Sequence, residues 1–119
     1  MRVVALVDDL LDRSKLAAAV PAATFAREPG AVGPADVIVV DLAAHRGDLT
    51  TLRARQPAAW IVAYGRHTDT EALAAARAAG ADRVLPRSAF FRDPAAAVAA
   101  GPGAVPPSGR GGSGRDAAP

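Results

Sequence analysis

The stretch Val37-Ile38-Val39-Val40-Asp41 is a short apolar run that ends in a carboxylate, and Val3-Val4-Ala5-Leu6-Val7 followed by Asp8 and Asp9 repeats this pattern. Short runs rich in β-branched residues are typical of buried strands. Neighbouring parallel strands end at the same edge of a sheet. We therefore expect the three carboxylates to lie close together at one edge.

Apolar runs alternate with helical patterns along the rest of the chain. Strands are predicted over residues 2–7, 23–26, 37–40, 60–64 and 83–86. Helices are predicted from Asp12 or Ser14 to about Val20, over 49–56 with Asp48 as N-cap, from Asp69 or Thr70 to a C′ glycine at Gly80, and from Asp93 and Pro94 onward. Residues 27–34 hold two prolines and two glycines, so the second crossover should be abbreviated.

This order predicts one α/β domain, a doubly wound parallel sheet of five strands in the order 2-1-3-4-5. The domain should cover residues 1–100, because residues 101–119 are almost entirely Gly, Pro, Ala, Ser and Arg and favour a disordered tail. The ligand site of such a sheet lies where strands 1 and 3 end, which is where the three carboxylates fall.

Composition limits the classes of function. The chain of 119 residues has no cysteine, which excludes disulfides and thiolate metal sites, and its first apolar run is too short for a signal peptide or a membrane span. We expect a cytoplasmic protein that binds no membrane. The net charge is +2 and the arginines are scattered among few aromatic residues, so no nucleic-acid partner is expected.

Several polar and aromatic residues are candidates for a functional site. His45 and His67 fall in predicted loops, where a histidine usually faces solvent. Trp60 and Tyr64 are interpreted as packing or surface aromatics of the fourth strand. No Ser-His-Asp or Cys-His arrangement indicates a hydrolase, and the tail glycines have no strand before them, so they are not a phosphate-binding loop.

At these residues the chain resembles the receiver domain of two-component response regulators, over about residues 2 to 98. The resemblance rests on Leu6-Val7-Asp8-Asp9, on Val39-Val40-Asp41-Leu42, on Asp48 seven residues later, and on Ala78-Ala79-Gly80-Ala81-Asp82. It implies that Asp41 accepts a phosphoryl group from a histidine kinase and that Asp8, Asp9 and Asp41 hold a magnesium ion. A hard cation with oxygen ligands suits that chemistry.

The chain also departs from the receiver pattern. Gly65 stands where receivers carry a Thr or Ser, Arg87 where they carry a lysine, Ser88 where a proline follows it, and Val84 where they carry the switch aromatic. The ending from Val84 to Phe91 is similar to that of pseudo-receivers. Arg87 is predicted to contact a phosphate, or more simply to be the counter-ion of the acidic pocket.

The sequence therefore predicts a stand-alone, atypical receiver-like signalling protein, a monomer or weak homodimer, that acts by binding a partner protein and is not an enzyme. Partner contacts are expected on residues 69–98, through Arg77, Arg83, Phe90 or Phe91. One alternative is a phosphorylation-independent adaptor. A small magnesium-dependent phosphotransferase is the other, and it is disfavoured because nothing in the chain could form a cap over the site.

Overall fold

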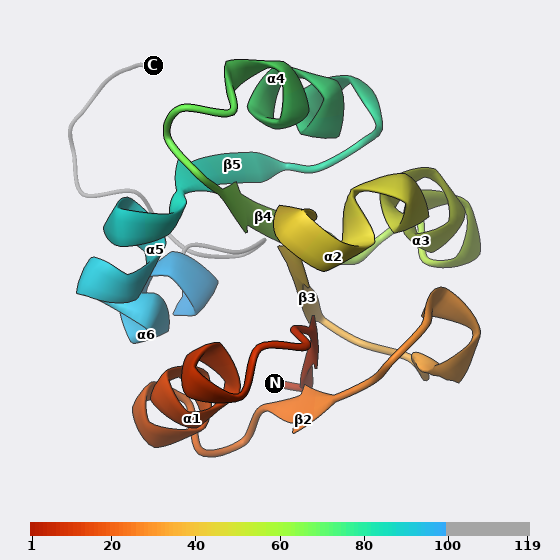
Figure 1. Ribbon diagram of the computed structural model, residues 1–119. Coiled ribbons are helices and arrows are strands. Elements are labelled where there is room, and N and C mark those ends of the chain that lie inside the picture. Colours follow the sequence, from red (N-terminus) through yellow and green to blue (C-terminus); the bar gives the residue numbers. More distant parts are fainter. Residues whose placement is uncertain (100–119) are drawn as a thin grey trace, which may run out of the picture.

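The computed structural model describes residues 1–99, which form one five-stranded parallel sheet with helices on both faces (Figure 1). The strands are β1 (Val3–Leu6), β2 (Thr24–Phe25), β3 (Val37–Asp41), β4 (Trp60–Gly65) and β5 (Arg83–Pro86). Their order is β2-β1-β3-β4-β5, and every neighbouring pair is parallel. The predicted α/β class and strand order are confirmed.

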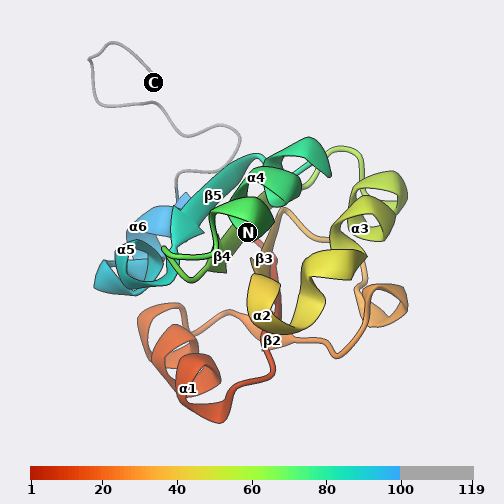
Figure 2. The same cartoon turned by 45° about the horizontal axis from the view of Figure 1, so that its top comes forward.

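Helices fill the connections and cover the two faces of the sheet (Figures 1 and 2). They are α1 (Leu10–Ala19), η1 (Pro29–Ala31), α2 (Leu42–His45), η2 (Arg46–Asp48), α3 (Leu49–Arg55), α4 (Thr70–Ala78), α5 (Arg87–Arg92) and α6 (Pro94–Ala99). Buried residues of α2, α3 and α4 share one core cluster, and those of α1, α5 and α6 share the other. The chain is thus wound on both sides of the sheet.

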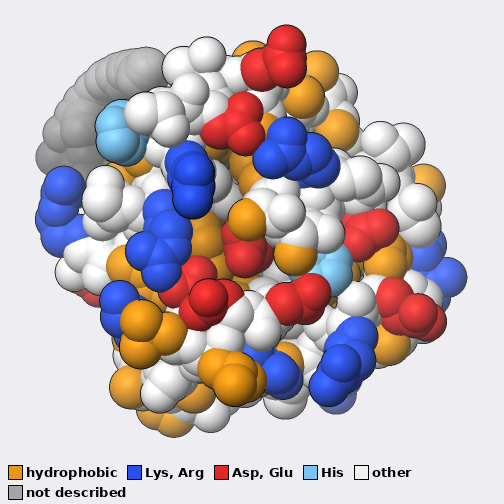
Figure 3. Space-filling model, viewed as in Figure 1, with side chains coloured by type: hydrophobic (Ala, Val, Ile, Leu, Met, Phe, Trp, Pro, Cys, Tyr) orange, Lys and Arg blue, Asp and Glu red, His pale blue; other side chains and the backbone are white. Residues whose placement is uncertain are grey.

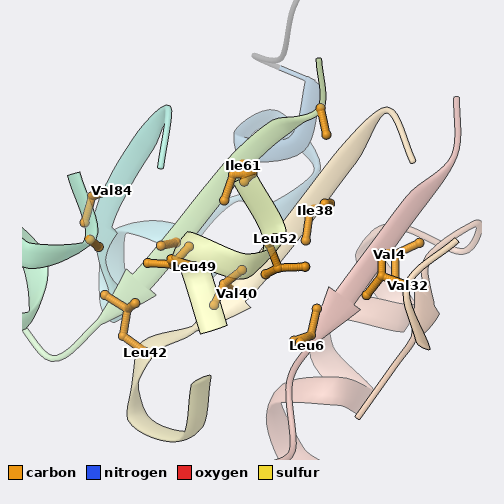
Figure 4. Packing of buried hydrophobic residues seen from close by; sticks show 13 residues of the cluster. Val4, Leu6, Val32, Ile38, Val40, Leu42, Leu49, Leu52, Ile61 and Val84 are labelled. Carbon is orange, nitrogen blue, oxygen red and sulfur yellow. The ribbon is translucent and has the colours of Figure 1, made fainter. Parts of the chain in front are cut away.

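Alternate residues of β3 pack into the two hydrophobic cores on opposite faces of the sheet. Ile38 and Val40 point to the α2–α3–α4 side, where Figure 4 shows them beside Leu49 and Leu52, whereas Val37 and Val39 belong to the opposite core. All four are fully buried. Burial on both faces explains why this strand is a continuous apolar run and does not alternate with polar residues.

The second crossover is abbreviated, as predicted. Between β2 and β3 there is a single turn, η1, and Val32 after it is buried in the core. The side chain of Gln56 replaces the hydrogen bonds that a longer helix would supply. It accepts from the Ala35 N–H at 2.9 Å and donates to the carbonyl of Gly33 at 2.8 Å.

Two local predictions are wrong, and one helix is not predicted. The first helix begins at Leu10 with Asp9 as its N-cap, so Asp12 lies inside the helix and is not a cap. The segment after Asp41, expected to be a loop, forms α2, because the Asp41 side chain accepts from the Ala43 N–H and caps that helix. A further helix, α5, follows β5 directly.

No helix among residues 1–99 combines the length and the apolar character that a membrane crossing requires. The predicted tail, residues 101–119, lies outside the described residues.

Gly80 is the predicted C′ residue of α4, and it has φ +114°. A Cβ added there would lie 2.9 Å from Cγ of Arg53, the arginine that donates to the Gly80 carbonyl. We expect Gly80→Ala to lower the free energy of unfolding by about 1–3 kcal/mol in a urea titration, because of the left-handed backbone and this contact. Gly47→Ala is the control, since nothing lies within 4 Å of its added Cβ. Equal effects of the two substitutions would contradict this account.

Candidate functional site

Asp41 ends β3 and lies in a pocket at the carboxyl edge of the sheet. Its side chain is buried, and one oxygen accepts from the Ala43 N–H at 3.0 Å. The pocket measures about 380 Å³ and is lined by Asp9, Asp12, Asp41, Ala43, Gly65, Arg66 and Arg87. Burial raises the pKa of Asp41 above its usual value, and the charge of Asp12 adds to this, although the Ala43 hydrogen bond opposes it. Figure 3 shows acidic and basic side chains gathered on this face.

The three predicted metal ligands are not gathered around one point. Asp9 and Asp41 line the same pocket, but Asp9 also caps α1 by accepting from the Asp12 N–H at 3.0 Å. Asp8 does not line that pocket and pairs with His45. Within residues 1–99, no group of three or more His, Cys, Asp or Glu side chains could hold a metal ion. This arrangement does not fit magnesium on all three carboxylates, and the binding of magnesium stays a prediction.

His45 was expected to face solvent from a loop, and this prediction is wrong. It ends α2, is buried, and contacts a carboxylate through each ring nitrogen: Nε2 lies 2.8 Å from Asp8 Oδ1 and Nδ1 lies 2.8 Å from Asp48 Oδ2. Burial alone would lower the pKa of His45, but the two carboxylates outweigh it and raise the pKa. Asp48 makes no side-chain cap bond to α3, because its carboxylate is turned toward His45.

Arg87 is a counter-ion of the pocket, but its bonded partner is Asp12. Its guanidinium makes two hydrogen bonds to the Asp12 carboxylate, one of them from Nε at 3.3 Å. Tyr64 Oη donates to the same carboxylate at 3.0 Å. The hydrogen bond to Asp12 raises the pKa of Arg87, and burial, with the nearby charges of Asp41 and Asp12, raises the pKa of Tyr64. The role of Arg87 as a phosphate contact stays a prediction.

Gly65 lies beside the pocket where a receiver would have a hydroxyl. A Cβ at this position would lie 3.3 Å from Cδ1 of Leu42 and 3.5 Å from Cδ2 of Leu73. The Cβ of a Thr or Ser would therefore fit tightly against the residue that follows Asp41. Leu42 is itself buried in the core, so it cannot give way without cost.

An aromatic cluster lies behind Arg87. Tyr64 stacks on Phe90 with ring centroids 4.8 Å apart, and Phe91 packs edge-on against both rings. Phe90 is fully buried, so the expectation that it could contact a partner is wrong. The Arg87 guanidinium lies 5.1 Å from the Phe91 ring centroid, which fixes its direction further.

Sequence reasoning missed the roles of Asp12, Tyr64 and His45. One signal could have indicated the last: His45 and Asp48 are three residues apart, a spacing at which side chains meet on a helical turn. No comparable local signal points to Asp12, since its partners are 52 and 75 residues away.

No protein-family model matches the chain, and no curated protein matches it in sequence. Solved structures do match it. A response regulator from Burkholderia pseudomallei, with a phosphorylated aspartic acid, a calcium ion and citrate, is 21% identical with a TM-score of 0.69, over 82% of this chain and 65% of that one. A response regulator receiver domain protein from Clostridium thermocellum is 13% identical with a TM-score of 0.68, over 82% and 90%. The Mn²⁺-bound response regulator Rcp1 is 10% identical with a TM-score of 0.65, over 79% and 88%.

At these identities the likeness shows the fold. The chain has the flavodoxin-like fold of response-regulator receiver domains, as the resemblance predicted. It spans 65% of the Burkholderia protein's length.

Asp12→Ala removes the acceptor of both Tyr64 and Arg87. We expect it to lower the free energy of unfolding by about 2–3 kcal/mol, below the full cost of a broken buried ion pair because the arginine is partly exposed. Asp93→Ala, which removes the exposed N-cap of α6, should cost only about 1 kcal/mol. Urea titrations compare the two, and an Asp12→Ala loss no larger than that of Asp93→Ala would refute the role of this pair.

Asp41→Asn should stabilise the fold near neutral pH. The pKa of Asp41 is raised in the folded state, so its contribution to stability is full below the ordinary value of 3.8 and is lost as the pH rises through the folded value. Asparagine keeps the cap of α2 without the charge. The midpoint of urea unfolding should therefore exceed wild type at neutral pH, and the gain should vanish in acid. Asp93→Asn, at an exposed cap, should show no such pH-dependent gain.

Proposed function

We propose that this chain is a receiver-like signalling module that binds a partner protein, and that its acidic edge is set by internal ion pairs and not by phosphorylation of Asp41. The observation that carries this proposal is that the charged side chains around Asp41 are already bonded to other groups of the chain. Asp8 is paired with His45, Asp9 caps α1, and Arg87 is bound to Asp12. Each group that would handle a metal or a phosphoryl oxygen already has a partner within the chain.

Gly65 supports the same proposal. A receiver that reads phosphorylation needs a group that moves toward the phosphoryl oxygen, and Gly65 has no side chain to move. A Cβ added at Gly65 would contact Leu42 and Leu73. A well-packed core has few states to switch between, so this edge is suited to presenting one surface.

The surface beside this edge favours a protein partner. Leu10 and Leu11 begin α1, directly after the two adjacent aspartates, and are 77% and 60% exposed. Figure 3 shows hydrophobic side chains exposed next to acidic ones on this face. Apolar anchors with a charged rim are the composition of protein interfaces. We place the partner contact here, in addition to the predicted residues Arg77 and Arg83, which lie in the last turn of α4 and at the start of β5.

A second candidate function is phosphoryl transfer to Asp41 from a histidine kinase, as in a two-component system. It is favoured by one observation: Asp41 and Asp9 both line the 380 Å³ pocket, which leaves room for a phosphoryl group. The Burkholderia protein of the same fold carries a phosphorylated aspartic acid and a calcium ion. In that case Asp41 would be the acceptor and Arg87 would have to exchange Asp12 for the phosphoryl oxygens.

Incubation with acetyl phosphate and magnesium separates the two functions. We expect intact-mass spectra of wild type and Asp41→Asn to stay the same, because the neighbouring groups are engaged and no hydroxyl stands at Gly65. A phosphorylation-competent receiver domain in the same tube shows that the donor is active. A phosphoryl adduct on wild type that is missing from Asp41→Asn would establish the second candidate.

A further inference from the structure

His45 is held between two carboxylates that come from different parts of the chain. Asp8 lies in the connection between β1 and α1, and Asp48 ends η2. Their oxygens lie 2.8 Å from Nε2 and from Nδ1 of the ring. The histidine side chain is 6% exposed, whereas that of Asp8 is 57% exposed. The ring is therefore enclosed, and one of its two partners faces the solvent.

This geometry determines the charge of the ring. An ionised carboxylate only accepts hydrogen bonds, so a nitrogen that bonds to it must carry a proton. Neutral imidazole has one such nitrogen, and imidazolium has two. Because both nitrogens meet a carboxylate, the ring is satisfied only as a cation. Hydrogen bonds between such ions are the strong, short kind.

A cation bonded to Asp8 disfavours a second one on the same carboxylate. Magnesium and manganese bind carboxylate oxygens directly and need several oxygen ligands at one point. An ion on Asp8 would lie within a few ångströms of the His45 ring, where like charges repel strongly. Asp8 should therefore join Asp9 in holding a metal more readily when the histidine pair is broken.

We propose that His45 is the resident cation of the acidic edge and keeps divalent metal ions off Asp8. The side chain thus takes the place of a metal in balancing the adjacent aspartates. This inference shares with the proposed function the pairing of Asp8 with His45. The two failures are distinguishable, because metal binding is measured without a phosphoryl donor and phosphorylation is measured by mass.

His45→Phe tests the proposal, because phenylalanine keeps the ring but cannot carry charge or bind metal. We expect it to bind Mn²⁺ at least about tenfold tighter than wild type, since apparent affinity falls with the fraction of molecules whose ligands are free. The measurement is free Mn²⁺ by electron paramagnetic resonance, with folding checked by circular dichroism. His67→Phe, at an exposed histidine, is the matched control and should bind as wild type does.

Wild type binding Mn²⁺ as tightly as His45→Phe would overturn the proposal, and so would an equal gain in His67→Phe. A second measurement needs no variant. In ¹⁵N-labelled wild type at neutral pH, both ring nitrogens of His45 should show an attached proton, and Mg²⁺ should leave these signals in place. A single protonated nitrogen, or signals displaced by Mg²⁺, would refute the proposal even if His45→Phe did not fold.

Discussion

A buried carboxylate needs hydrogen-bond or ion-pair partners, and those of the Asp12 carboxylate connect distant parts of this chain. Its two oxygens are bonded by Tyr64 from β4 and by Arg87 from the start of α5, 52 and 75 residues away. The Asp12 side chain therefore joins α1, β4 and α5. Tyr64, which bonds to Asp12, also stacks on Phe90 of α5. Loss of either partner would leave the buried Asp12 carboxylate with fewer hydrogen bonds, so the three side chains depend on one another.

The sheet could be predicted from the sequence because its causes are local. Apolar runs of four or five residues identify the strands. Helix caps, prolines and glycines identify the segments that join them. Because parallel connections are right-handed, few orders of the strands in the sheet are possible. That argument also places Asp41 and Asp9 at one edge, where the structure has them. It does not say which oxygen meets which nitrogen. The sequence predicts Asp12 or Ser14 as the cap of the first helix, whereas in the structure Asp9 is the cap and Asp12 pairs with Arg87.

His45 shows the same limit in another form. Its segment is predicted to be a loop, but Asp41 is both the last residue of β3 and the cap of α2. A helix that starts immediately at the strand end turns its fourth residue back toward the sheet edge. The histidine is thereby carried to Asp8, a contact across 37 residues that no local pattern contains. Gly65 is similar. The sequence shows that it has no side chain, whereas only the packed fold shows that a Cβ there would contact Leu42.

His45 and Arg87 place cationic side chains among the carboxylates of this edge. Adjacent carboxylates repel, and a divalent ion would offset two negative charges. His45 and Arg87 supply the same two positive charges from within the chain, one on Asp8 and Asp48 and the other on Asp12. Their positions are fixed by covalent connection to α2 and α5, so no loss of a free ion's entropy is required. Asp41 is bonded by neither cation, and burial raises its pKa. The fold therefore disfavours the negative charge of the residue on which phosphorylation would depend.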